Sequence, residues 1–393
     1  MTLFYAGYNI TCRTIFCLLL LLLLLTPSIC FSQPDWQFIP SLSVSEEYDS
    51  NVYSTSSSTE DYVTKIGTNL NATYNGPDVE IKGGYLLNFN SYASQPEANV
   101  FTHGGNINIG LNRWFQKVSK GGGLTVTERF NFTPDLADSN IEGDTSGNYG
   151  IKTVRSDIFR NSAGFNISLP VTQPFSLNTS YSNTLTDYSS SLYKDNITNT
   201  LGLGAGYFHK QDTFYSNISI SSTRAEQEDS NNYSITFGVK HPFSQYTSLD
   251  ANAGISLVAP ESGKNETAMR GSVGLTKRME WHTFTTGYSR SLNSTSGISG
   301  TPIIADLYYL NLSNIHSQYL SSGIGANYSS NRSIKGSEVD TQSYNINGSL
   351  NYTIRKWLTC SLSMSHFNQL SQIATISEMK RNQITLSLVS TWL

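Results

Sequence analysis

The chain has 393 residues, of which 38% are hydrophobic and 14% charged, and its formal net charge is −4. So few charges argue against disorder, which combines low hydrophobicity with high net charge. Only Cys360 lies beyond residue 32, which excludes the small secreted folds that disulfide bonds hold together.

Residues 1–32 have the pattern of a secretory signal peptide. Arg13 supplies a positive charge, and Leu18 to Leu25 is an unbroken run of leucine. The apolar run is about 10 residues long, whereas a helix needs about 20 to span a bilayer. We expect cleavage after Ser32 and a mature chain, residues 33–393, that folds as one domain.

From residue 38 onward, apolar and polar residues alternate in segments of about 10–14 residues, the pattern of strands with two different faces. Clear examples are residues 62–74, 79–89, 233–240, 249–257 and 344–352. In the first segment, Tyr62, Ile66 and Leu70 share one face, and Lys65 and Asn69 share the other. Helical spacing is found nowhere at length.

Short and long connections alternate between these segments. The predicted short turns are residues 75–78, 210–212, 241–243 and 355–356, and the predicted long loops include 54–60, 135–153, 189–196, 226–231 and 294–303. Short turns at one end and long loops at the other are typical of outer-membrane barrels. The predicted fold class is an all-β, antiparallel, up-and-down transmembrane β-barrel of about 18 strands (16–20), with periplasmic turns and longer extracellular loops.

Tryptophans and charges follow the same alternation. The tryptophans are all predicted at the short-turn end, where an indole ring suits the membrane interface; they are Trp36, Trp114, Trp281, Trp357 and Trp392. The short turns are basic and the long loops mostly acidic. We assign Glu46, Glu47 and Asp49 to the first acidic stretch, which either binds divalent cations or keeps the surface solvated.

A secreted β-solenoid is the strongest rival, because it also favours Asn, Ser, Thr and Gly. Alternating loop lengths indicate hairpins instead of coils, and Phe and Tyr are numerous for a solenoid. A barrel also explains the low hydrophobic fraction, since lipid contacts one face and the other encloses a polar interior.

The segment Ile39 to Tyr53 resembles the start of an outer-membrane β-barrel family encoded beside exopolysaccharide and PEP-CTERM protein-sorting systems. The similarity lies in Tyr48-Asp49-Ser50-Asn51-Val52, and the basic-aromatic turns around Trp281 and Trp357 are also similar to that family. The resemblance implies an outer-membrane location, polysaccharide or export components as partners, and no established catalytic residues.

The final strand, predicted over Asn382 to Leu393, resembles the closing strand that barrel-assembly machinery recognises. It differs in ending on Leu393 instead of an aromatic residue. We therefore expect this machinery, outer-membrane lipid and lipopolysaccharide as partners, and no nucleic acid.

Charged residues on the polar faces are the candidate functional residues. They are Lys65, Lys82, Arg129, Asp250 and Arg270. Inside a barrel they would either set ion selectivity or brace the wall in ion pairs. Two charges are predicted on the apolar face: Glu128, which requires a bulge or a shielded surface, and Arg290, which can extend to the interface.

The sequence offers little evidence of chemistry. His103 and His366 are predicted near extracellular strand ends, but each stands alone without a serine motif. We expect no enzyme activity, cofactor or metal. Two functions remain, a pore for polysaccharide or small solutes and a structural or adhesive surface barrel with a blocked lumen; an outer-membrane hydrolase is a weaker third.

Overall fold

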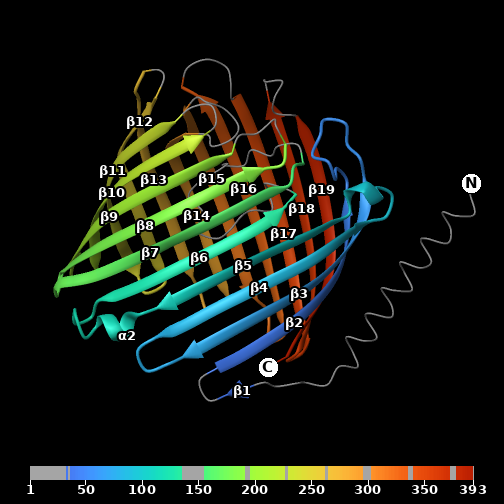
Figure 1. Ribbon diagram of the computed structural model, residues 1–393, viewed down its shortest axis with the longest axis horizontal. Helices are drawn as coiled ribbons and strands as arrows, with labels where there is room; N and C mark the ends of the chain where they lie inside the picture. Colours follow the sequence, from blue (N-terminus) through green and yellow to red (C-terminus); the bar gives the residue numbers. More distant parts are fainter. Residues whose placement is uncertain are drawn as a thin grey trace, which may run out of the picture.

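The strands of the chain form one closed sheet. The computed structural model describes residues 32–33, 36–134, 155–190, 195–225, 229–261, 264–294, 302–334, 340–371 and 378–392. Each long strand pairs antiparallel with its neighbours in the sequence, and the last pairs with the first (Figure 1). The resulting 18-stranded barrel confirms the predicted fold class and strand number.

The barrel strands are β2 (Trp36–Asp49), β3 (Asp61–Asn75), β4 (Glu80–Tyr92), β5 (Val100–Gly110), β6 (Gly123–Thr133), β7 (Ile158–Thr172), β8 (Phe175–Tyr188), β9 (Asn196–His209), β10 (Asp212–Ala225), β11 (Ser230–Ser244), β12 (Thr247–Pro260), β13 (Glu266–Arg278), β14 (His282–Ser294), β15 (Pro302–Ile315), β16 (Leu320–Ser333), β17 (Asp340–Arg355), β18 (Leu358–Ser371) and β19 (Met379–Thr391). A further short strand, β1 (Ser32–Gln33), pairs with the start of β2. Two short helical segments, η1 (Pro96–Ala98) and α2 (Asn112–Phe115), lie in connections. No helix in the described part of the chain is long and apolar enough to cross a membrane.

The two faces of the sheet differ in polarity. Leu70 of β3 is paired with Tyr85 of β4 on the outward face, while the adjacent inward pair is Asn71 with Gly84. Large apolar side chains are exposed on the outward face. Met269, for example, has 77% of its surface exposed. Apolar surface left in water costs about 25 cal/mol per Å², so a wall of this kind is stable only in contact with hydrocarbon.

Connection length separates the two ends of the barrel. The connections 173–174, 210–211, 245–246 and 356–357 lie at the end where β2 begins and β19 ends. All five tryptophans also lie at this short-turn end, in the positions that the alternation predicts. The other end, which we call the long-loop end, carries the connections after β2, β4 and β6.

One connection at the short-turn end is long. Residues 111–122 contain α2 and pack against the neighbouring turn, where Arg113 Nη1 donates a 2.8 Å hydrogen bond to the carbonyl of Gly76. Lys117 Nζ also lies 2.7 Å from the carboxylate of Asp78. Gly121 closes this connection with φ of +79°, a conformation that glycine adopts without steric strain.

Several predicted boundaries are wrong, because residues assigned to connections lie in strands; Ser230 and Asn231, for example, lie in β11. Residues 241–243, predicted as a turn, lie in β11, and the turn follows at 245–246. A register shift between Pro242 and Ser244 accommodates the proline, which has no N–H for the ladder. Glu46, Glu47 and Asp49, predicted in an acidic loop, lie instead in β2; Glu47 and Asp49 are its last inward-facing residues, and Glu46 faces outward in register with Leu386.

Other predictions fall on residues outside the described part. The signal peptide is predicted over residues 1–32, of which only Ser32 is described. The whole loop predicted over 135–153 and the C-terminal Leu393 also lie outside the described residues. Cleavage and the recognition signal of the last strand therefore stay predictions.

The closed ladder makes a prediction about resistance to detergent. An unboiled sample should migrate differently from a boiled one on a denaturing gel, because a barrel has no free strand edge from which unfolding can start. A lipid-refolded sample that gives one mobility before and after boiling would contradict the closed barrel.

Candidate functional site in the lumen

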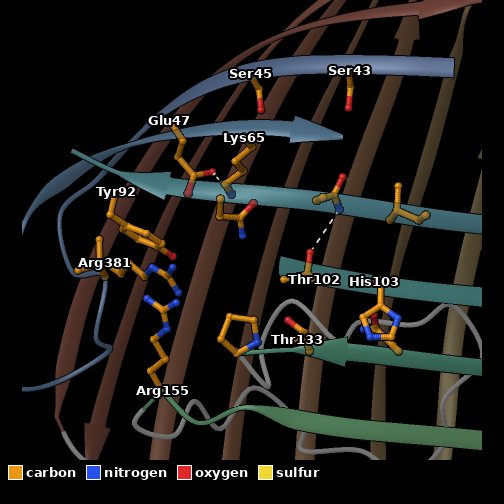
Figure 2. A pocket seen from close by; sticks show the side chains of 16 residues that line it. Ser43, Ser45, Glu47, Lys65, Tyr92, Thr102, His103, Thr133, Arg155 and Arg381 are labelled. Atoms are coloured by element: carbon orange, nitrogen blue, oxygen red, sulfur yellow. Dashed lines mark hydrogen bonds and ion pairs between the residues drawn. The ribbon is translucent and has the colours of Figure 1, made fainter. Parts of the chain in front are cut away.

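The inward face forms a pocket at the long-loop end of the barrel. The pocket has a volume of about 280 Å³ and is lined mainly by β2 to β6, together with residues that follow β6 and precede β7 (Figure 2). Serine, threonine and asparagine side chains form much of its wall. Four charged side chains also line it, namely Glu47, Lys65, Arg155 and Arg381.

Glu47 of β2 connects three strands across the barrel seam. Lys65 Nζ of β3 lies 2.9 Å from Glu47 Oε2, and Thr385 Oγ1 of β19 donates to the same oxygen at 2.8 Å. Gln383 Nε2 donates to the other carboxylate oxygen at 3.2 Å. The Glu47 side chain is only 8% exposed, and burying a carboxylate is costly unless such partners compensate it.

Asp49 and Arg381 form a second and more buried pair at the seam. Arg381 Nη2 donates to Asp49 Oδ2 at 2.6 Å and Arg381 Nε donates to the same carboxylate, with side-chain exposures of 7% and 2%. Asn51 extends the pair, since its N–H donates to Asp49 Oδ1 and its amide to the carbonyl of Lys380. We call Glu47, Asp49, Asn51 and Arg381 the seam cluster.

Arg155 holds the segment before β7 against the first two loops. Its N–H donates to the carbonyl of Tyr53, and its Nη2 donates to the carbonyl of Ala98 at 2.6 Å. The guanidinium lies 4.8 Å from the ring centroid of Tyr92, which allows a cation–π interaction. Its Nη1 is buried and has no hydrogen-bond partner among the described residues.

Two further contacts order the same loops. The Tyr53 hydroxyl donates to Glu97 at 2.6 Å; this hydrogen bond raises the pKa of Tyr53 to about 12 and lowers the pKa of Glu97. Asp61 accepts hydrogen bonds from the backbone N–H groups of Ser94 and Gln95. The pocket therefore lies beneath loops that side chains tie together.

All five candidate residues from the sequence occupy inward positions. Lys65 is in the pocket, paired with Glu47. Lys82 lies 2.7 Å from Glu80 on the same strand, and both side chains are well exposed. Arg129 faces inward from β6 in register with Asn106 of β5.

The other two candidates lie on the β12–β13 part of the wall. Asp250 accepts a 2.6 Å hydrogen bond from the Tyr215 hydroxyl and lies 3.4 Å from Lys240 Nζ. Arg270 of β13 is paired with Gly254 of β12. The structure therefore gathers only Lys65 into the pocket and distributes the other four around the lumen.

The strands β14 to β18 form a wall of different character. Their inward side chains are mostly hydroxyls and amides; Asn327 is paired with Asn345, and the hydroxyls of Ser329 and Ser343 lie 2.7 Å apart. In the described parts of these strands, no charged residue occupies an inward position before Arg355 at the turn. The lumen thus has a charged side and an uncharged side.

Glu128 and Arg290, the two charged residues predicted on the apolar face, both lie on that face. Glu128 faces outward between Ile107 and Ala163 without a bulge in β6, and Asn161 donates to it at 3.4 Å. Arg290 does not need to extend to the interface, because it donates two hydrogen bonds, at 2.6 and 2.8 Å, to Asp306.

The two histidines considered for catalysis lie on the outward face. His103 borders the pocket, but its ring packs among Phe130, Phe132 and Tyr85, and its Nδ1 has no partner among the described residues. His366 Nδ1 lies 2.6 Å from Asn382 Oδ1. Among the described residues, no three His, Cys, Asp or Glu side chains are placed to hold a metal ion.

The sequence reasoning missed the seam cluster and Arg155. A signal for Glu47 and Asp49 exists, because the polar alternation that begins at Ser41 continues unbroken to Asp49. Arg381 has the same parity in β19 as the polar residues Gln383, Thr385 and Ser387. Arg155 follows a long connection, so no local pattern marks it.

Comparison with known proteins identifies the fold but no family. No protein-family model matches the chain, and no curated protein matches its sequence. The barrel is similar to OpdO of Pseudomonas aeruginosa, with a TM-score of 0.50, 11% identity, and coverage of 91% of this chain and 97% of that one.

Two other solved barrels have comparable similarity. OccK2 (OpdF) of Pseudomonas aeruginosa has a TM-score of 0.49 and 10% identity over 91% of this chain and 98% of its own. A BenF-like porin from Pseudomonas fluorescens Pf-5 has a TM-score of 0.49 and 11% identity over 90% of this chain and 98% of its own. The comparison with OpdO supports the barrel fold and no more than the fold.

The seam cluster makes a prediction about stability. The variant Arg381→Met should lower the free energy of unfolding by about 3–5 kcal/mol, because it leaves the buried Asp49 carboxylate without its cation. Denaturant titration of the barrel in lipid vesicles measures this loss.

Lys82→Met provides the matched control, since its pair with Glu80 is exposed and such pairs contribute about 0–1 kcal/mol. The double variant Asp49→Asn/Arg381→Met should recover part of the loss. Equal stabilities of the Arg381 and Lys82 variants would contradict the account of the seam.

Proposed function

We propose that the protein is a pore of the outer membrane through which small polar solutes pass. The observation that carries the proposal is the inward face, which is lined by hydroxyl, amide and paired charged groups while the outward face is apolar. A wall of this kind keeps water inside the barrel and hydrocarbon outside.

The inward charges suit a selective pore. On the side formed by β19 and β2 to β7, Lys65 and Arg381 are held in place by Glu47 and Asp49, so the positions of these charges are fixed. Fixed charges create a field in the lumen, which orients a charged or dipolar solute.

A surface barrel with a closed lumen is the second function. The ties among the loops at the long-loop end favour it, because Arg155 and Tyr53 fix these loops over the pocket. In this alternative the loops are the functional surface, and no solute passes.

The link to exopolysaccharide export rests on the resemblance of residues 39–53 alone, and it stays a proposal. The structure gives the Tyr48 to Val52 segment a local role, since Asp49 and Asn51 join β2 to β19. Genes for polysaccharide synthesis beside the gene for this protein would support the link.

Planar-bilayer recording tests the pore. Purified protein should insert with stepwise increases in conductance, and Ser349→Trp should lower the unit conductance because residue 349 faces inward. Its neighbour Leu350 is 43% exposed on the outward face, so Leu350→Trp is the matched control and should leave the conductance unchanged. Insertion without conductance at any voltage would contradict the pore and support the surface barrel.

A further inference from the structure

Two tyrosines lie flat against the inward wall, closer to the short turns than the pocket is. Tyr215 of β10 crosses Gly238 of β11, at which a Cβ atom would collide with the ring. Tyr309 of β15 crosses Gly287 of β14, at which a Cβ atom would lie 2.6 Å from the ring carbon Cζ. The glycines therefore allow both rings to lie along the wall instead of projecting from it.

The two rings extend toward the same pair of strands from opposite sides. The Tyr215 hydroxyl donates to Asp250 on β12 at 2.6 Å. The Tyr309 hydroxyl oxygen lies over Gly274 on β13, 3.0 Å from the point that a Cβ atom would occupy at that glycine. Asp250 and Gly274 are directly paired, so the two rings border one strip of wall that is two strands wide.

This strip carries polar groups that are open to the lumen. Asp250 is 46% exposed and lies 3.4 Å from Lys240 Nζ, whose side chain is 61% exposed. Asn252 donates to the hydroxyls of Ser272, at 2.6 Å, and Tyr215, at 3.3 Å. A carboxylate, a carboxamide and a serine hydroxyl thus lie between the two flat rings, and the Lys240 ammonium lies over the Tyr215 ring, 5.7 Å from its centroid.

The combination matches the chemistry of a sugar. A pyranose has an apolar face of C–H groups, which an aromatic face can cover, and a rim of hydroxyls, which carboxylates and amides bind. We propose that Tyr215, Tyr309 and the strip between them bind sugar rings inside the lumen. The proposal rests on the proposed pore only in that a sugar must be able to enter the lumen.

Tyrosines can also cross glycines for packing alone, which fills the space that a glycine leaves in a sheet. The position of Phe208 indicates a role for these aromatic rings beyond packing. It faces inward at the short-turn end of β9, paired with Thr213 of β10, and it is 52% exposed. With Tyr215 it continues the aromatic surface to the rim of the barrel.

Saturation-transfer NMR on the full-length barrel in detergent measures sugar binding without any need for conduction. Maltose is the probe, and polyethylene glycol of similar mass is the control, because it has ether oxygens but no ring face. Irradiation of aromatic protons should transfer saturation to the ring protons of maltose and not to polyethylene glycol. In planar bilayers, maltose should lower the ion current to a saturable limit.

Variants separate a binding role from a packing role. Tyr215→Ala and Tyr309→Ala should each raise the half-saturating maltose concentration roughly threefold to tenfold, the usual effect of losing one aromatic contact. Tyr309→Phe keeps the ring and should change the half-saturating maltose concentration by less than about twofold. Tyr233→Ala removes an outward-facing tyrosine, 43% exposed, and should have no effect.

The outcomes distinguish this proposal from the pore. Conductance without saturation transfer or a maltose effect would overturn the sugar surface and leave the pore intact. Saturation transfer without conductance would support the sugar surface and contradict the pore. Equal half-saturating maltose concentrations in all variants would show that the tyrosines only pack over glycines. That result would also overturn the proposal.

Discussion

The pairing of β19 with β2 is the constraint on which the rest of the structure depends. In hydrocarbon, each unpaired backbone N–H or C=O group costs several kcal/mol, so an open sheet of these strands would be unstable. Closure brings the first and last barrel strands together and fixes an even strand number. Among the ion pairs of the described residues, the most buried, Asp49 with Arg381, lies at this seam.

Closure gives the wall two environments, and polar residues are stable in only one of them without special partners. On the inward face, water and paired charges solvate Lys82 and Asp250. On the outward face, Arg290 donates two hydrogen bonds to Asp306. The lumen then differs around its circumference, since charges gather on β19, on β2 to β7 and on β11 to β13, and hydroxyls and amides on β14 to β18.

Much of the fold could be predicted from the sequence, because a period of two residues directly records which face each residue occupies. The strand number and the inward side of Lys65 follow from that period alone. The partners could not be predicted, since Glu47 and Arg381 meet only through closure across the whole chain. Pro242 was misleading because a register shift accommodates it within a strand.

The two-faced wall is tested most directly by labelling single cysteines. In a Cys360→Ser background, Asn345→Cys and Ile346→Cys place a thiol on neighbouring positions of β17 that face in opposite directions. In lipid vesicles, a hydrophilic maleimide should label residue 345 rapidly and residue 346 slowly, because only the inward face contacts water. Equal labelling of both positions, or faster labelling of residue 346, would contradict the barrel described above.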